Sequence, residues 1–120
     1  MASSGIASDI GGFNTGVTAL AGGANSASTP IMSSGINVVS VCASAGDSVI
    51  LPASMPQGAK IRVFNTSAAT LDIFPNTGAT INGGTADSEK GIATLTGATF
   101  VQVATTGLTW VADNLIAKQS

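Results

Sequence analysis

The sequence predicts an all-β fold, an antiparallel β-sandwich or short barrel with an extended N-terminal arm. From about Ile36 onward, short runs rich in β-branched and apolar residues alternate with turns built from Gly, Pro and Asn. Several short strands at this spacing are typical of a sandwich or barrel. Before Ile36 the chain consists mainly of Ser, Gly, Ala, Thr and Asn. We therefore divide it into an arm and linker at residues 1–35 and a β-domain at residues 36–120.

The apolar residues of the arm have a spacing that allows two interpretations. Steps of four and three residues, which form the seam of an amphipathic helix, separate Ile6, Ile10, Phe13, Val17 and Leu20. Interior glycines oppose a helix here, because each destabilises it by about 1 kcal/mol relative to alanine. The alternative, which we favour, is an extended arm that docks these apolar side chains on a partner. Residues 21–30 then form a linker without fixed structure.

The β-domain begins with "INVVSVCA" at residues 36–43, which is rich in β-branched residues. Gly46 and Asp47 form a turn, and a proline-containing loop occupies residues 52–58. The tetrad at residues 75–78 and the glycines at 83–84 mark two further turns. The remaining strands are predicted at residues 48–52, 59–65, 70–75, 79–82, 91–95, 99–104 and 108–113, the last two joined by a hairpin turn at residues 105–107.

Alternation along these strands predicts which side chains face the core. The expected core residues are Ile61, Val63, Leu71, Ile73, Val101 and Val103, and Trp110 is also expected inside. By the same alternation, three of the four phenylalanines fall on outer faces, namely Phe64, Phe74 and Phe100. Either they fold back over a sheet edge or a bulge changes the alternation, or another subunit covers them.

The residue types needed for catalysis are largely missing. The chain has no histidine and one cysteine, Cys42, which excludes Ser-His-Asp and Cys-His centres and leaves too few ligands for zinc. We expect Cys42 to pack as an apolar residue. Asp87 and Glu89, with Asn82, offer oxygen ligands of the kind that Ca²⁺ takes, but we favour a solvated loop in which Glu89 pairs with its neighbour Lys90. The sequence therefore predicts a protein that is not an enzyme and uses no cofactor or metal.

The low charge of the chain bears on its partners. Charged residues make up 8% of the sequence and the formal net charge is -2, so no basic patch exists to bind nucleic acid. No apolar run approaches the roughly 20 residues of a membrane span, and the start of the chain lacks a secretory signal. We expect synthesis in a cytoplasm. A surface so poor in charge is typical of one largely covered by other protein, because repulsion between copies is weak.

Three segments resemble small virion proteins of tailed bacteriophages, of the capsid-decoration (cement) or head-fibre type. They are "TALAGGANSASTPIMSSGINVVSVCASAGDSVILPAS", "GAKIRVFNTSAATLDIFPNTGATINGG" and "ATFVQVATTGLTWVA", which together cover roughly residues 18–112. The resemblance implies a small β-sandwich, often trimeric, that binds the outside of an assembled shell. It carries over no functional residues, because the similar positions are turn and core positions.

The function expected from these observations is structural. The chain would decorate and stabilise a capsid on its exterior, oligomerising as a trimer and clamping neighbouring copies of the major capsid protein. The candidate subunit or capsid contacts are Ile6, Ile10, Phe13, Val17, Leu20, Phe64, Phe74 and Phe100. The alternative is a fibre or tail-associated module that binds a host glycan or receptor.

Overall fold

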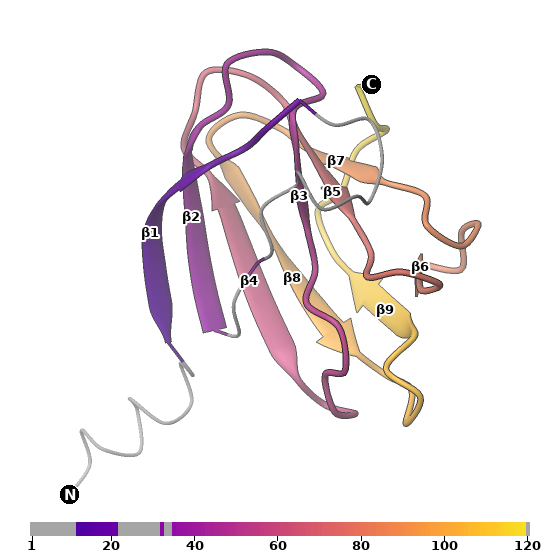
Figure 1. Cartoon of the computed structure of the whole chain (residues 1–120). Helices are drawn as coiled ribbons and strands as arrows, with labels where there is room; N and C mark the ends of the chain where they lie inside the picture. Colours follow the sequence, from indigo (N-terminus) through magenta and orange to yellow (C-terminus); the bar gives the residue numbers. More distant parts are fainter. Residues whose placement is uncertain (1–11, 22–31, 33–34, 120) are drawn as a thin grey trace, which may run out of the picture.

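The computed structural model describes residues 12–21, 32 and 35–119. These residues contain no helix and form two sheets. Sheet A has six strands in the order β1-β2-β4-β8-β9-β6, and sheet B has three in the order β3-β5-β7 (Figure 1). The strands are β1 Phe13–Thr18, β2 Gly35–Val41, β3 Ser48–Ile50, β4 Lys60–Asn65, β5 Leu71–Phe74, β6 Thr80–Ile81, β7 Lys90–Ile92, β8 Thr96–Gln102 and β9 Thr109–Ala112.

The chain winds between the two sheets as a β-solenoid of about three turns. It passes from β2 in sheet A to β3 in sheet B, then returns to β4 in sheet A and crosses again to β5. Each return to a sheet places the new strand parallel to the strand one solenoid turn earlier. This gives the parallel pairs β1–β2, β2–β4 and β3–β5. Paired residues are 23, 26 and 24 positions apart in these pairs, as in Phe13–Ile36, Gly35–Ile61 and Ser48–Asp72.

The all-β prediction is confirmed, but the antiparallel sandwich is wrong. Among the pairs of named strands in the described residues, only β4–β8, β5–β7 and β8–β9 are antiparallel, and the last of these is the predicted hairpin. The physical reason lies in the turns. Gly, Pro and Asn show where a strand ends, but the same residues serve a chain that reverses beside itself and one that crosses to the other sheet. Most of the turns here lead across to the other sheet, and in β2, β4 and β5 the chain then pairs in parallel with the strand one solenoid turn earlier.

Part of the predicted arm belongs to the fold. Residues 13–18 form β1, an edge strand of sheet A, so the helical interpretation is wrong for these residues. After β1 the chain crosses to sheet B, where Leu20 forms an antiparallel bridge with Ser48 and the Met32 N–H donates to the Ile50 carbonyl (2.7 Å). Ala19 and Met32 are buried in the core. Ile6 and Ile10 lie outside the described residues.

The core lies between the two sheets. The predicted core residues Ile61, Val63, Leu71 and Ile73 are fully buried, and so is Trp110, whose Nε1 donates to the Asn76 Oδ1 (2.7 Å). Trp110 therefore has both its apolar ring and its N–H satisfied inside the protein.

The prediction of which β8 side chains face the core is wrong. Phe100 and Gln102 point inward, whereas Val101 is half-buried and Val103 is exposed. Pairing with β4 sets the inward face of β8, because Phe100 lies opposite the core residue Ile61 and opposite residues point to the same side of a sheet. The Gln102 Oε1 accepts the backbone N–H groups of Ala104 and Thr109, which closes the hairpin, whereas its Nε2 is buried without a hydrogen-bond partner among the described residues.

A buried asparagine shapes the corner after β4. The Asn65 Nδ2 donates to the carbonyls of Ala69 (2.8 Å) and Ile92 (3.0 Å), and its Oδ1 accepts the N–H and hydroxyl of Ser67 (3.0 and 2.6 Å). The Asn65 carbonyl in turn accepts the N–H of Leu95 (2.7 Å). Because a buried amide is stable only when its donors and acceptors are satisfied, this network holds two distant loops in one arrangement.

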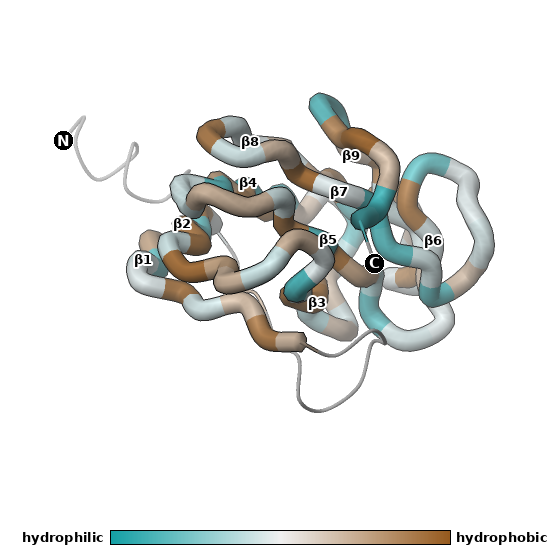
Figure 2. Tube along the Cα trace, turned by 90° about the horizontal axis from the view of Figure 1, so that it is seen from above, coloured by the Kyte–Doolittle hydropathy of each residue, from teal (hydrophilic) through white to brown (hydrophobic). Residues whose placement is uncertain are grey.

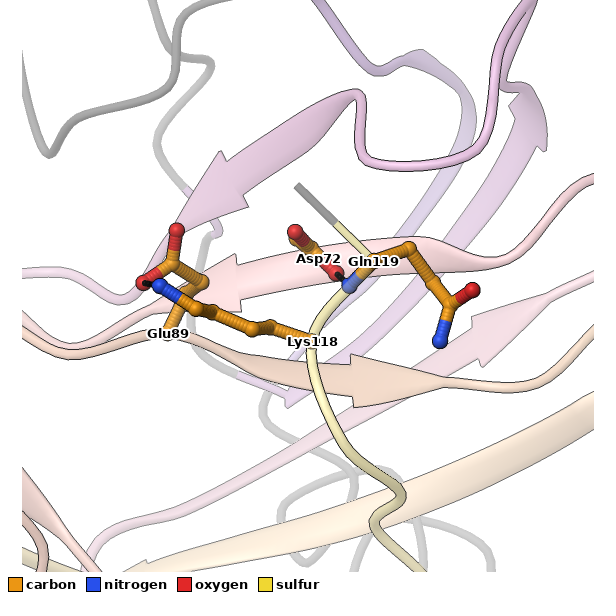
Figure 3. A network of polar contacts seen from close by, with 4 residues as sticks. All are labelled: Asp72, Glu89, Lys118 and Gln119. Atoms are coloured by element: carbon orange, nitrogen blue, oxygen red, sulfur yellow. Dashed lines mark hydrogen bonds and ion pairs between the residues drawn. The ribbon is translucent and has the colours of Figure 1, made fainter.

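The C-terminal segment adds to sheet B. Ile116 exchanges two backbone hydrogen bonds with Gly91 of β7 (2.8 and 2.9 Å). Beyond it, the Gln119 N–H donates to the Asp72 Oδ1 (2.9 Å) and the Lys118 Nζ lies 3.5 Å from the Glu89 Oε1 (Figure 3). The segment thus lies against the side of sheet B that faces away from the core.

Candidate functional site

The polar residues considered for metal binding have structural partners instead. The Asp87 Oδ1 accepts the backbone N–H of Gly78 (2.7 Å), and Glu89 pairs with Lys118 rather than with Lys90 as predicted. Asn82 bonds both backbone groups of Ala112, which ties β6 to β9. Within the described ranges, no three His, Cys, Asp or Glu side chains are grouped so that they could hold a metal ion.

Cys42 is buried, and its Sγ contacts the carbonyls of Ser44 (3.4 Å) and Thr70 (3.7 Å). Burial and, after it, the negative charge of Asp47 raise the pKa of the Cys42 thiol. A neutral, enclosed thiol is a poor nucleophile. Cys42 therefore acts as a packed core residue, as the sequence predicts.

The surface feature that stands out is the outer face of sheet A, the face turned away from sheet B. It carries apolar side chains from β1 to β9, together with Leu95 just before β8, and we call these residues the outer-face patch: Phe13, Ile36, Val38, Phe64, Leu95, Val101 and Val111. Figure 2 shows hydrophobic segments along β1 and β2 and in β9. Phe13, Leu95 and Val111 are 67%, 78% and 49% exposed. Lys60 and Arg62 of β4 lie on the same face, between the end with Phe13 and Leu95 and the end with Val101 and Val111. Exposed apolar groups of this kind mark protein contact sites.

One end of the outer-face patch is hollowed. The hollow has a volume of about 470 Å³ and is lined by Phe13, Val38, Phe64, Asn65, Thr66, Leu95, Thr96 and Gly97. None of these residues is charged, so the hollow suits apolar side chains of a partner. It crosses the strands, because its lining comes from β1, β2, β4 and the start of β8.

The floor of the hollow is set by a close contact between Phe64 and Gly97. The two residues are opposite each other in the β4–β8 pair, and a Cβ added at Gly97 would lie 2.4 Å from the Phe64 Cδ1. Glycine therefore allows the ring to lie across β8 on the outer face. The Arg62 guanidinium stands 5.0 Å from the ring centroid, within the range of a cation–π contact.

Leu95 also lines the hollow and is held in an uncommon backbone conformation. Its φ is +58°, in the left-handed region that disfavours residues with a branched side chain, and its side chain is 78% exposed. The hydrogen bond from its N–H to the Asn65 carbonyl fixes this conformation. Strain of this kind persists only where the surroundings enforce it, and it concentrates at functional positions.

The predicted contact residues fall into different places. Phe13 and Phe64 lie in the outer-face patch, Leu20 is partly exposed beside sheet B, and Val17 packs against the core. Phe74 and Phe100 are only 2% and 0% exposed, so the expectation that they face outward is wrong. Phe74 belongs to β5, which is buried on both faces, and the pairing of β8 turns Phe100 inward.

Sequence analysis missed Leu95, Val38 and Gly97 as parts of one site. Val38 is far from Leu95 and Gly97 in the chain, and only the β2–β4 and β4–β8 pairings bring the three together. The one local signal was the "TLTG" segment at residues 94–97, where an apolar residue stands inside a turn.

No protein-family model and no curated protein matches this chain. Within the part of the chain that the structure describes, there is no helix with the length and hydropathy required to cross a membrane.

Proposed function

We propose that this protein is a structural virion protein, not an enzyme, that decorates and stabilises a bacteriophage capsid as a homo-oligomer. The observation that carries the proposal is the outer-face patch, a hollowed apolar surface on a body with only 8% charged residues. The resemblance of residues 18–112 to small phage virion proteins supports the same conclusion.

The chemistry of the patch supports contact with protein. Its lining offers neither a nucleophile nor a charged group, so it can bind apolar side chains but cannot transfer a proton or hold an anion. Removing a Phe or Leu side chain from water contributes about 1.5–3 kcal/mol. A few such residues on each partner provide a useful part of a binding energy, particularly when several copies bind one shell together.

The partner we propose is the major capsid protein, together with further copies of this chain, on the virion exterior. The low net charge of -2 supports dense packing of copies, because their mutual repulsion is weak. The proposed role requires no cofactor, nucleic acid or membrane.

Co-sedimentation with assembled shells tests the proposal. The purified chain would be mixed with assembled shells of a tailed-phage major capsid protein, and occupancy measured by mass. We expect saturable binding that Phe13→Ser weakens at least tenfold, because copies joined through the outer-face patch gain from binding one shell together. The matched control, Leu108→Ser, changes a residue 40% exposed in the β8–β9 hairpin and should bind normally.

Two outcomes would contradict the proposal. The full chain could fail to bind shells at all, or it could bind a glycan array instead, which would favour the fibre or receptor-binding alternative. The role of the arm needs a shorter deletion than residues 1–35, because residues 13–19 and Met32 belong to the fold. Removal of residues 1–11 tests the arm without removing β1.

A further inference from the structure

We infer that the outer-face patch binds a second copy of this chain face to face, with Leu95 of each copy inserted into the hollow of the other. The inference deepens the proposed function, on which it rests for the expectation of a homo-oligomer, by naming the occupant of the hollow. It begins from the position of a projecting apolar side chain directly beside an apolar hollow.

The two halves of the contact are fixed in different ways. Leu95 projects because its left-handed backbone and its hydrogen bond to Asn65 hold the side chain in solvent, where it is 78% exposed. The hollow is open because Gly97 lets the Phe64 ring lie down against β8 and Val38 forms the adjoining wall. A leucine is an apolar group of the kind such a lining accepts.

The symmetry of the contact follows from the positions of the two features. A ring of three copies joins two different surfaces of each subunit, whereas a two-fold contact uses one self-complementary surface. Leu95 and the hollow share one face of sheet A and touch each other. A single two-fold rotation therefore buries both features on both copies, which favours a dimer over the trimer expected from the sequence.

Size and charge also fit a second copy. A stable contact covers about 800 Å² per partner, roughly one seventh of the 5721 Å² surface of this chain. The outer face of sheet A is six strands, or about 24 Å, wide, and its apolar residues extend from Phe13 in β1 to Val111 in β9. Lys60 and Arg62 of β4 also lie exposed on this face, but the lining of the hollow carries no charge, so no like charges meet where Leu95 inserts.

The decisive variant is Leu95→Asn. Asparagine adopts the left-handed conformation more readily than leucine, so this change relieves backbone strain while it removes the projecting apolar group. We expect the midpoint of urea unfolding to stay unchanged or rise when it is measured on monomer. In sedimentation equilibrium without any shell, we expect the dissociation constant of the dimer to rise at least tenfold.

Two further variants complete the experiment. Phe13→Ser removes a wall of the hollow and should weaken the dimer, and Leu108→Ser should leave it unchanged. A full chain that stays monomeric at about 100 µM, or a dimer that Leu95→Asn leaves intact, would overturn the inference, and a trimer would overturn the two-fold geometry. Because no shell is present, these results are independent of whether the chain decorates capsids.

Discussion

At the scale of single residues, Cys42 links burial to the pH dependence of stability. Burial, with the nearby Asp47 carboxylate, raises the thiol pKa in the folded protein. The folded state therefore keeps a proton that the unfolded chain begins to lose near its ordinary pKa of about 8.5. This contribution to stability is complete below that pH and is lost as the pH rises through the raised folded pKa.

The prediction is that stability falls between about pH 7.5 and 9.5 and that Cys42→Ala reduces this fall. The chain has no Tyr or His, so among its side chains Cys42 dominates titration in this window. Urea unfolding followed by Trp110 fluorescence at the two pH values measures it. The alanine variant is less stable at both pH values, so the quantity compared is the change in the free energy of unfolding between the two pH values. Equal slopes in the two proteins would contradict the assignment.

At the scale of elements, the contact of the C-terminal segment with β7 depends on Gly91. A Cβ added at Gly91 would lie 2.5 Å from the Ala117 carbonyl oxygen and 3.0 Å from the Ile116 Cγ1. The Ala117 oxygen belongs to the backbone, so the segment itself must move to accept any side chain there. The hydrogen bond between Gln119 and the buried Asp72 depends on the same close approach.

We predict that Gly91→Ala releases the segment. Hydrogen exchange at the Ile116 N–H should accelerate at least tenfold, because its bond to the Gly91 carbonyl (2.9 Å) is lost. Lys118→Ala is the control, since it removes the ion pair with Glu89 but leaves the close approach at Gly91 unchanged, so the Ile116 N–H should stay protected. Equal protection of Ile116 in Gly91→Ala and in the unaltered protein would show that the segment is held by other contacts.

At the scale of the whole molecule, the solenoid makes folding depend on distant contacts. Each parallel pair joins residues more than 20 positions apart, as in Phe13–Ile36 and Gly35–Ile61. Loops of this length must close before the pairs form, and that closure opposes early pairing. The sheets therefore assemble later than a set of hairpins would.

We predict refolding in milliseconds to seconds, the range of proteins dominated by non-local pairing. The only tryptophan, Trp110, is fully buried in β9, so its fluorescence in a stopped-flow experiment reports core formation. The measurement should be made at low micromolar concentration and repeated at several concentrations to separate folding from association. Folding within microseconds would contradict the importance of the parallel pairs.

Local patterns were sufficient to locate most strands. Eight predicted segments, beginning with residues 36–43, each overlap an observed strand, because β-branched alternation and turn residues act within a few positions. β1 was missed, since Gly16 and its polar neighbours weaken the pattern and its pairing with β2 stabilises it. In the same way, alternation placed Ile61 and Val63 correctly but failed for β8, where pairing to β4 fixed the face.

Composition and local spacing are enough to predict that this protein is all-β and lacks the residues for His-dependent chemistry. Tertiary structure decided the direction of each strand, the face of β8 and the outer-face patch. These depend on contacts between segments that are distant in the chain, such as the contact of Phe64 with Gly97. A turn residue specifies where the chain bends, whereas burial of the shared core decides which strand the next segment pairs with.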